Sequence, residues 1–212
     1  MKALITESDV ERARRDGGVL HVDGDYMLTP GAQDRMLKLG VRIESGRPGA
    51  DIARDRRVVI VASDHGGFDL KEDLKVHLQT LGYTVLDFGA ASREPVDYPD
   101  FAHAAAAAVA GGTADRAIVV DGAGIGSCMV ANKVPGVRAA KCDSMFDIEN
   151  SRRHNDANVL ALAGRLERSL AREMARLWLE TPFEGGRHAR RVDKIRDVEG
   201  RYLAREALHG HP

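Results

Sequence analysis

The sequence predicts an α/β protein: a Rossmann-like, doubly wound parallel sheet covered by helices on both faces (α/β/α), with a short N-terminal helical appendage. Two observations support this class. Apolar runs at residues 58–62, 117–120 and 159–162 lack polar alternation, which is typical of strands buried on both faces. Segments with the apolar spacing of amphipathic helices separate these runs, so strands and helices alternate along the chain.

From residue 58 onward the elements follow in a regular order. The first strand leads through a glycine pair into a helix whose Leu70, Leu74 and Leu78 share one face, and Gly82 ends this helix. The later elements are a strand over 84–89, an alanine-rich helix over 101–110, a strand over 117–120, the glycine loop at 121–126, a helix over 145–153, a strand over 159–162 and a long helix over about 170–180. Such alternation places crossover helices on each face of a parallel sheet.

The N-terminal part differs in character, so we divide the chain into residues 1–57, an extension and linker, and residues 58–212, the main domain. Thr6 and Asp9 are suited to begin a short helix over 10–13. Thr29 and Pro30 are suited to begin a second short helix, which follows them. Glycine, proline and mixed charges over 45–57 indicate the linker. The chain shows no internal repeat. The extension is too short to bury a core of its own, so we expect it to dock on another surface.

Composition and charge exclude several classes of function. The 212 residues are 43% hydrophobic, enough for a core, and 31 basic against 32 acidic side chains give a net charge of −1. This balance provides no positive field for nucleic acid or anionic lipid. The longest apolar run, residues 104–110, is too short to span a membrane, and the N-terminus lacks a signal-peptide core. Two cysteines without a CxxC pair fit a cytoplasmic, reducing compartment.

Ligands of open parallel sheets bind beyond the carboxyl ends of the strands, and three chemically rich loops are expected there. These loops are residues 63–67, 121–127 and 153–158, which carry Asp64, His65, Asp121 and His154. The glycines after Asp121 let backbone amides approach an anion at a helix N-terminus. Their spacing differs from a dinucleotide fingerprint because the third glycine comes one residue early. We therefore expect no nicotinamide or flavin cofactor, and no metal.

Six short motifs in this order are specific to one family. They are Ser63-Asp64-His65, Val96-Asp97-Tyr98-Pro99-Asp100, Gly124-Ile125-Gly126, Ala131-Asn132-Lys133, His154-Asn155-Asp156-Ala157-Asn158 and Glu184-Gly185-Gly186-Arg187-His188. Through these motifs, residues 58 to about 200 resemble ribose-5-phosphate isomerase B and the galactose-6-phosphate isomerase subunits. The resemblance implies a cofactor-independent aldose–ketose isomerase of sugar phosphates.

The resemblance also implies roles around the reacting carbons of the sugar. His154 would open the sugar ring by proton transfer to the ring oxygen, and Asn155 would bind the enediolate. Asp64 would hold sugar hydroxyls, and Tyr98 would line the pocket. Backbone amides of the glycine loop would stabilise the enediolate oxygen, at Gly122, Gly124 and Gly126. These roles fit the chemistry, because proton transfer between carbons needs a positioned base and an oxyanion site.

The phosphate of the substrate would be held by basic side chains. The resemblance implies contacts from His65, Arg165, Arg187 and Arg191, the last two reaching in from a neighbouring subunit. Guanidinium groups suit this task because they bind phosphate with two parallel hydrogen bonds. His188, between these arginines, is equally consistent with a surface position.

The position of the base departs from the family pattern. Most members carry a cysteine immediately before the glycine loop or a glutamate one turn later, where this chain has Asp121 and Ser127, and Ala123 replaces a small hydroxyl residue. Two interpretations stay open. In the first, Asp121 is the catalytic base, because a carboxylate in a partly dry pocket can remove a proton. In the second, Asp121 caps the following helix, and the chain is inactive or needs a second chain. The candidate catalytic residues are Asp121 and His154.

The N-terminal extension carries a second, shorter resemblance. Residues 4–10, 27–32 and 39–43 resemble the opening segment of some ethanolamine-utilisation proteins of bacterial microcompartments. This resemblance implies that residues 1–57 dock on a shell or cargo partner, and that the cytoplasmic protein is enclosed in such a compartment. The alternative is an arm that pads the oligomer.

Together these observations predict conversion of ribose 5-phosphate to ribulose 5-phosphate through a cis-enediolate. We expect a homodimer or homotetramer whose active site is shared between subunits. Two alternatives stay open: an isomerase of a tetrose or hexose phosphate, and a non-catalytic partner subunit that binds a sugar phosphate.

Overall fold

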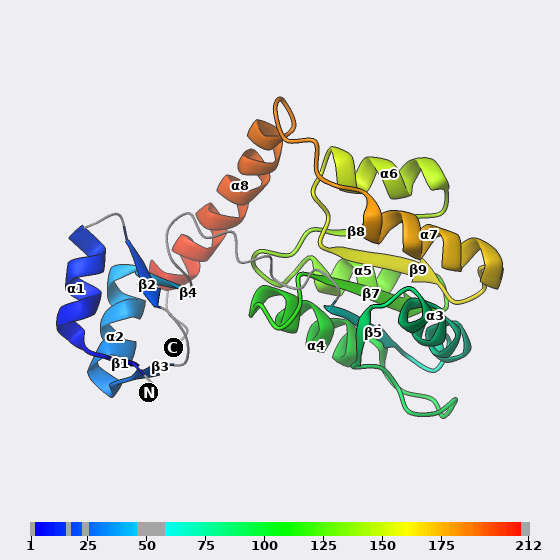
Figure 1. Ribbon diagram of the computed structural model, residues 1–212, viewed down its shortest axis with the longest axis horizontal. Coiled ribbons are helices and arrows are strands. Elements are labelled where there is room, and N and C mark those ends of the chain that lie inside the picture. Colours follow the sequence, from blue (N-terminus) through cyan, green and yellow to red (C-terminus); the bar gives the residue numbers. More distant parts are fainter. Residues whose placement is uncertain (1–2, 16–17, 23–25, 46–57, 209–212) are drawn as a thin grey trace. The chain divides into compact units, whose positions relative to one another are not determined.

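The computed structural model describes residues 3–15, 18–22, 26–45 and 58–208, which Figure 1 draws in colour. The chain divides into two compact units, Met1–Arg54 and Asp55–Pro212, and each is described by itself. The linker expected over 45–57 lies outside the described residues except for Ser45.

The larger unit contains a five-stranded parallel sheet. Its strands are β5 (Val58–Ser63), β6 (Thr84–Asp87), β7 (Arg116–Asp121), β8 (Ala139–Lys141) and β9 (Val159–Ala163). Their order across the sheet is β6-β5-β7-β9-β8, and every neighbouring pair is parallel. Because β5, β7 and β9 are adjacent and point the same way, their carboxyl ends lie together at one edge.

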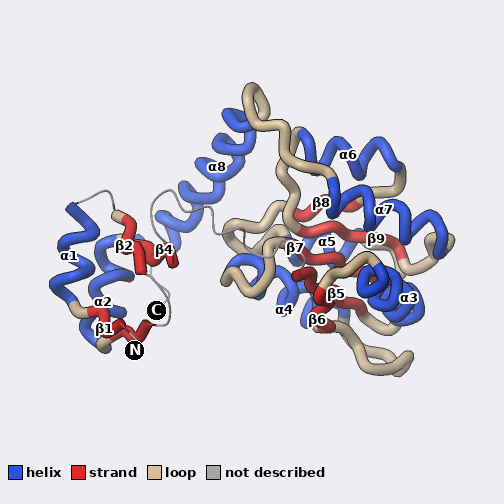
Figure 2. Tube along the Cα trace, viewed as in Figure 1, coloured by secondary structure: helices blue, strands red, loops and turns tan. Residues whose placement is uncertain are grey.

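Helices cover both faces of this sheet, which confirms the predicted three-layer fold (Figure 2). Side chains alternate along β5: Val59 and Val61 belong to one apolar core, and Ile60 and Ala62 belong to the other. The first core includes residues of three helices, α3 (Phe68–Thr80), α6 (Met145–Arg153) and α7 (Arg168–Glu180). The second includes residues of α4 (Tyr98–Ala110) and α5 (Ile125–Ala131).

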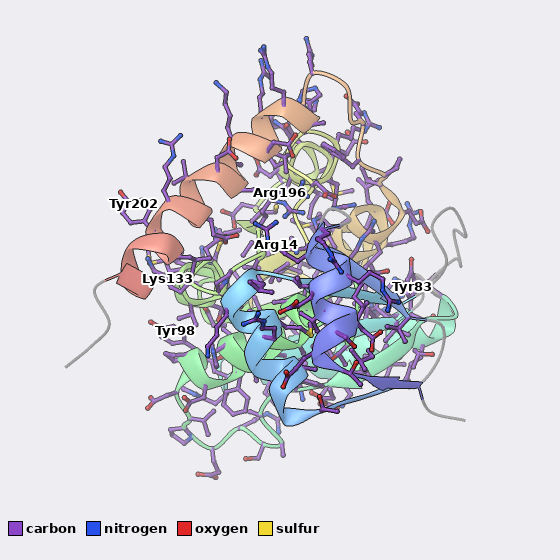
Figure 3. All side chains as sticks on the ribbon, turned by 90° about the vertical axis from the view of Figure 1, so that its left-hand side faces the viewer. Arg14, Tyr83, Tyr98, Lys133, Arg196 and Tyr202 are labelled. Atoms are coloured by element: carbon purple, nitrogen blue, oxygen red, sulfur yellow. The ribbon has the colours of Figure 1, made fainter. Side chains whose placement is uncertain are left out.

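A final helix, α8 (Ala189–Leu208), is one that the sequence pattern does not predict. It is held to the rest of the unit by Val192, which is buried, and by the Glu199 carboxylate, whose two oxygens each accept from the Gly136 amide at 3.0 Å. Tyr202 and other apolar side chains farther along α8 are exposed (Figure 3). None of the helices in the described segments is long and apolar enough to cross a membrane.

The smaller unit is built from two copies of one strand–helix–strand pattern. The first copy is β1 (Ala3–Ile5), α1 (Glu7–Arg15) and β2 (Val19–Val22); the second is β3 (Tyr26–Leu28), α2 (Pro30–Leu39) and β4 (Arg42–Ser45). Ala3 pairs with Tyr26 and Val19 with Arg42, the same spacing of 23 positions in both parallel pairs. The expectation that the chain has no internal repeat is therefore wrong for this unit.

The two predicted helices of the smaller unit are present, and their caps explain where they begin. The Thr29 hydroxyl accepts from the Ala32 amide at 3.2 Å, and the Thr6 amide donates to the Asp9 carboxylate at 2.9 Å. The four short strands are an addition to the predicted helical appendage. They help to enclose a small core that the sequence does not lead us to expect, formed by Ile5, Val10, Ala13, Val22, Ala32 and Val41.

Candidate active site

The segments that follow β5, β7 and β9 meet at the carboxyl edge of the sheet. The amide of Gly164, directly after β9, donates to the Asp121 carbonyl at the end of β7 at 2.7 Å. A Cβ atom on Gly164 would lie 2.3 Å from the carbonyl oxygen of Gly66, so glycine is required for this close approach of two loops. The side chains of Asp64 and Asp121 are both buried here. The structure thus brings the first two predicted loops together.

We expect Gly164→Ala to lower the free energy of unfolding by roughly 1–3 kcal/mol, because the backbone of a neighbouring loop must move. A matched control is Gly200→Ala on α8, where an added Cβ has no neighbouring atom within 4 Å. The control should leave stability unchanged or raise it by up to about 1 kcal/mol, since alanine favours helix over glycine. Urea denaturation measures both variants. Equal stability of the two would contradict a tight junction at Gly164.

Asp121 organises the glycine loop. Its carboxylate accepts from the amides of Ala123 and Ser127, each at 2.8 Å, and from the amide of Gly124. Burial would raise the pKa of Asp121, but hydrogen bonds from Ser127, Ala123 and Gly124 outweigh it and hold that pKa below its ordinary value. Both carboxylate oxygens are engaged with the loop and with the first turn of α5. These contacts favour the helix-capping interpretation of Asp121 over the catalytic one.

The same contacts reduce the number of loop amides that can bind an oxyanion. The amides of Ala123 and Gly124 donate to Asp121, so they are not free to bind a developing enediolate oxygen. Among the hydrogen bonds of the described residues, none is donated by the amides of Gly122, Ile125 and Gly126. These three amides are the candidate donors, two of them at the N-terminus of α5, where the helix dipole also favours negative charge.

Tyr98 covers part of this loop. It is the first residue of α4, and a Cβ atom on Gly126 would lie 2.6 Å from the tyrosine ring. Glycine at position 126 therefore allows the tyrosine ring to approach the glycine loop. The Tyr98 ring thus lies against the glycine loop.

His65 and Arg165 complete the carboxyl edge. Nδ1 of His65 lies 3.1 Å from the carbonyl oxygen and 3.2 Å from the amide nitrogen of Val96, a contact that fixes the ring and leaves Nε2 for a ligand. Arg165 directly follows Gly164, and its side chain is exposed. One histidine and one guanidinium of the expected phosphate set therefore lie at this edge.

A second polar cluster lies at the opposite, amino edge of the sheet. His154 caps the C-terminus of α6, ahead of β9, and His188 lies just ahead of α8. Their rings stack with centroids 4.0 Å apart and an angle of 3° between planes. Nε2 of each ring lies 3.7 Å from the same Oε2 atom of Glu184, and Arg187 Nε donates to His188 Nε2 at 3.2 Å. His188 is only 4% exposed, so it is not a surface residue.

The motif Glu184-Gly185-Gly186-Arg187-His188 forms this cluster through a tight turn. Gly185 and Gly186 have φ angles of 64° and 51°, a left-handed conformation that favours glycine at both positions. The turn brings His188 back beside Glu184, and the Glu184 amide donates to the Arg153 carbonyl at 3.1 Å, next to His154. Neither Glu184 nor His188 is among the candidate site residues read from the sequence, although both belong to a matched motif.

Within the described part of the chain, His154, Glu184 and His188 also form a set whose donor atoms lie within 4.8 Å of one another, close enough for a metal ion. The parallel stacking of the two rings does not direct both nitrogen lone pairs at one point, as a metal ion requires. The cluster as described therefore lacks the geometry of a metal site.

The two clusters are separated by the length of a strand. His154 and Asn155 precede β9, whereas Gly164 and Arg165 follow it, and β9 contains five residues. At about 3.3 Å per residue the clusters are roughly 16 Å apart along the sheet. The prediction that the loop at 153–158 lies at the carboxyl edge of the same chain is therefore wrong, because a loop that enters a parallel strand lies at its amino end.

This separation also changes how the expected site residues are grouped. Arg187 lies against His188, which stacks on His154, and Arg191 lies in the first turn of α8. A chain that supplies these arginines to a neighbour's carboxyl edge therefore supplies His154 with them. The expected exchange between subunits involves a whole cluster rather than two arginines alone.

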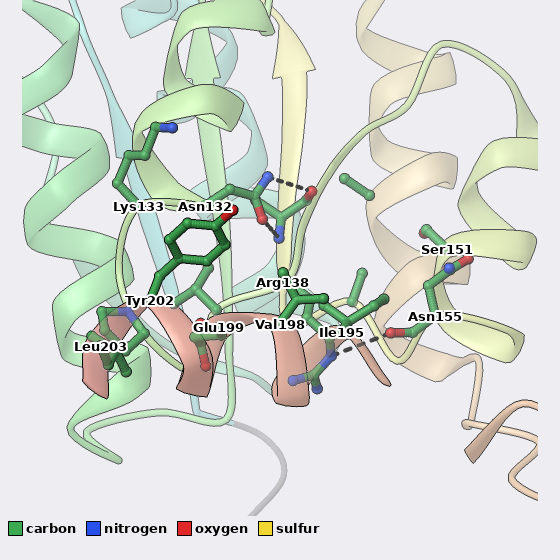
Figure 4. A pocket seen from close by; sticks show the side chains of 15 residues that line it. Asn132, Lys133, Arg138, Ser151, Asn155, Ile195, Val198, Glu199, Tyr202 and Leu203 are labelled. Carbon is green, nitrogen blue, oxygen red and sulfur yellow. Dashed lines mark hydrogen bonds between the residues drawn. The ribbon is translucent and has the colours of Figure 1, made fainter. Parts of the chain in front are cut away.

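A pocket of about 740 Å³ lies at the amino edge, between α8 and the start of β8 (Figure 4). Asn155 lines it, and its side chain is exposed. Apolar side chains of α8 form one wall and polar side chains of the main body form the other: Ile195, Val198, Tyr202 and Leu203 face Asn132, Lys133 and Arg138. The α8 residues of this wall are exposed, between 44% and 65%.

Comparison with known proteins gives the class of this fold and site. The profile of the ribose/galactose isomerase family matches residues 59–195, well over half of the chain. The protein is thus an enzyme of the aldose–ketose isomerase class. The chain belongs to the ribose/galactose isomerase family.

Individual relatives agree with this assignment. Ribose-5-phosphate isomerase B of Escherichia coli is 43% identical over 139 residues, which cover 65% of this chain and 93% of the relative. D-erythrulose-4-phosphate isomerase of Pectobacterium atrosepticum is 39% identical over 140 residues, 65% and 91% of the two chains. The structure of ribose-5-phosphate isomerase B from Clostridium thermocellum is 47% identical, with a TM-score of 0.67, and the match covers 68% and 99% of the two chains.

Proposed function

We propose that this protein converts ribose 5-phosphate to ribulose 5-phosphate through a cis-enediolate. The observation that carries the proposal is the glycine loop at the carboxyl edge, which has three amides without protein partners among the described hydrogen bonds, beside the buried Asp64. Such amides stabilise negative charge on O1 while the proton at C2 is removed; removing one donor of this kind typically costs about 10²- to 10³-fold in rate. The names of the relatives from Escherichia coli and Clostridium thermocellum support a pentose phosphate.

A tetrose phosphate is the second candidate substrate. It is supported by the likeness to D-erythrulose-4-phosphate isomerase, which is nearly as similar to this chain as ribose-5-phosphate isomerase B. The enediolate chemistry at C1 and C2 is the same in both cases, whereas the distance from these carbons to the phosphate differs. The position of the phosphate-binding arginines relative to the glycine loop therefore decides between the two substrates.

We propose that a complete active site contains two copies of the chain. Ring opening by His154 and proton transfer at the glycine loop both involve C1 of one sugar, so both clusters must contact one substrate. Within one chain they lie roughly 16 Å apart, across the length of β9. In a homodimer with twofold symmetry, the amino edge of each chain can complete the carboxyl edge of its partner. The exposed apolar wall of α8 and its pocket supply a surface for such an interface.

For the base we propose Asp64, with Asp121 as a positioning residue of the loop. Asp64 is 8% exposed, and its Oδ1 accepts from the Gly67 amide at 2.9 Å. Among the hydrogen bonds of the described residues, its Oδ2 takes part in none, whereas both oxygens of Asp121 are engaged. A carboxylate with one oxygen free of protein contacts can take a proton from C2 of the bound sugar. It is better suited to this task than a carboxylate that accepts from three amides.

We propose the N-terminal unit as a docking module for a partner of a bacterial microcompartment. It has its own small core, and the residues of the proposed isomerase site all lie in the larger unit. The sequence resemblance of residues 4–10, 27–32 and 39–43 is the support for the kind of partner. On this proposal the cytoplasmic enzyme is enclosed with other enzymes of the same compartment.

Proton NMR with ribose 5-phosphate in deuterated water tests the proposed reaction. The expected result is ribulose 5-phosphate that carries deuterium at C1, together with deuterium at C2 of the remaining aldose, because the enediolate is reprotonated from an exchanging base. A parallel sample with D-erythrulose 4-phosphate distinguishes the second candidate substrate. If neither sample shows conversion or exchange, both candidate substrates are refuted, and a binding subunit is left as the alternative.

A further inference from the structure

The stacked histidine pair at the amino edge has an unequal environment. His188 is 4% exposed, and its Nδ1 atom is buried without a hydrogen-bond partner. The side chain of His154 is 39% exposed. Both Nε2 atoms lie 3.7 Å from Glu184 Oε2, so one carboxylate oxygen faces two imidazoles. At that distance the carboxylate acts through charge, since a hydrogen bond would be shorter.

Arg187 fixes the state of one member of the pair. Its Nε–H donates to His188 Nε2, which must therefore be an acceptor without a proton. Burial lowers the pKa of His188, and His154, Arg187 and Arg191 act in the same direction, while Glu184 opposes them in part. The hydrogen bond from Arg187 and the lowered pKa both favour the neutral form of His188, whose ring stacks on that of His154.

Glu184 then has His154 as its charge partner. We propose that Glu184 is a positioning residue for ring opening: its carboxylate faces Nε2 of His154 and orients the imidazole, which stacks on the ring of His188. This role rests on the proposed isomerase function. The other charged groups of the cluster, Arg187 and Arg191, are positive, so Glu184 supplies the carboxylate that an N–H group of His154 can face.

Ring opening needs a proton at the ring oxygen of the sugar, and on this proposal Nε2 of His154 donates it. The bond between C1 and the ring oxygen of ribofuranose 5-phosphate breaks, and its electron pair takes the proton from His154 Nε2. The hydroxyl at C1 loses its proton to solvent while the C1=O double bond forms, and water returns a proton to His154. The open aldehyde and the imidazolium are then ready for the next step, with no net change in protons.

Ribulose 5-phosphate provides a substrate that does not need this step. Its O5 carries the phosphate, so no hydroxyl is available to close a five-membered ring onto C2. Exchange of its C1 protons with solvent requires the base and the glycine loop but no ring opening. A residue that acts only through His154 should therefore affect the turnover of ribose 5-phosphate and spare exchange into ribulose 5-phosphate.

The test is Glu184→Gln in the full-length protein, with Glu149→Gln as the control. Glu149 pairs with Arg153 at 3.3 Å, and the exposures of the Glu149 and Glu184 side chains are 40% and 47%. For Glu184→Gln we expect kcat for ribose 5-phosphate to fall at least about 10-fold, because the amide of glutamine lacks the negative charge that faces His154 Nε2. The Michaelis constant and the exchange into ribulose 5-phosphate should stay within about twofold of the unmutated protein.

Rescue separates charge from shape. Glu184→Asp retains the carboxylate and should recover most of the kcat for ribose 5-phosphate, whereas a role in packing would leave the aspartate and glutamine variants equally impaired. Equal losses with both substrates, or a kcat of Glu184→Gln that matches that of Glu149→Gln, would overturn the proposed role. Failure of the unmutated protein to convert either substrate would instead refute the isomerase function, and this role with it.

Discussion

Asp64→Asn is expected to abolish deuterium exchange at C2 of ribose 5-phosphate, with kcat lowered by about 10²- to 10⁴-fold, the range that a positioned general base contributes. Asparagine keeps an oxygen that can accept from the Gly67 amide, so the start of α3 is preserved. What is lost is the second carboxylate oxygen and the ability to hold a proton. Proton NMR in deuterated water measures exchange and conversion in the same sample.

Asp121→Asn is the matched variant at the same edge. Asparagine can still accept from Ala123 and Gly124 through its oxygen, but its amide group cannot accept from the Ser127 amide. Losing one hydrogen bond to a charged group is worth about 1.5–3 kcal/mol. The loop should therefore bind the enediolate oxygen less well, and exchange should slow by roughly 10- to 100-fold without disappearing.

The reverse pattern would assign the base differently. If Asp121→Asn loses exchange and Asp64→Asn keeps it, Asp121 is the base in spite of its amide contacts, as the first interpretation from the sequence holds. Asp121→Cys then becomes informative, because the family resemblance implies that a cysteine at this position can serve as the base. A carboxylate that merely holds the loop cannot be replaced by a thiol, whereas a base can be.

The sheet could be read from the sequence because its strands are buried on both faces. The runs at 58–62 and 117–120 are apolar without interruption, and they correspond to β5 and β7. The strands of the N-terminal unit were not predictable in this way. They have three or four residues each, too few to show a period, and their pairing depends on a repeat of 23 positions in which few residues are identical.

The sequence names candidate residues for the site, but motif matching alone does not give their grouping. His154 precedes a strand in the sequence, and this order already places it at the amino edge of a parallel sheet, away from Asp64. The roles of Glu184 and His188 depend on a turn with two left-handed glycines, which only the structure reveals. The contacts of Asp121 depend on how the loop folds back on its own first residue. Motif matching gives none of these three-dimensional relations.

Mixing two inactive variants is expected to restore activity. Asp64→Asn damages the carboxyl edge and His154→Ala damages the amino edge. If each site combines the carboxyl edge of one chain with the amino edge of its partner, a mixed dimer has both defects in one site and none in the other. Random pairing makes about half of the dimers mixed, each with one intact site of two, so activity should recover to about a quarter of that of the unmutated protein.

The control for this experiment pairs two defects of the same edge. Asp64→Asn mixed with Arg165→Ala leaves a substitution in every site of a mixed dimer, because both residues lie at the carboxyl edge. No recovery is therefore expected beyond the sum of the two variants. Recovery in the first mixture alone requires that the two edges of one chain serve different sites. Mass analysis shows whether mixed dimers have formed. If mixed dimers form but activity does not recover, both edges of one chain must contact the same substrate. That result would contradict the separation of roughly 16 Å that β9 sets between the two edges.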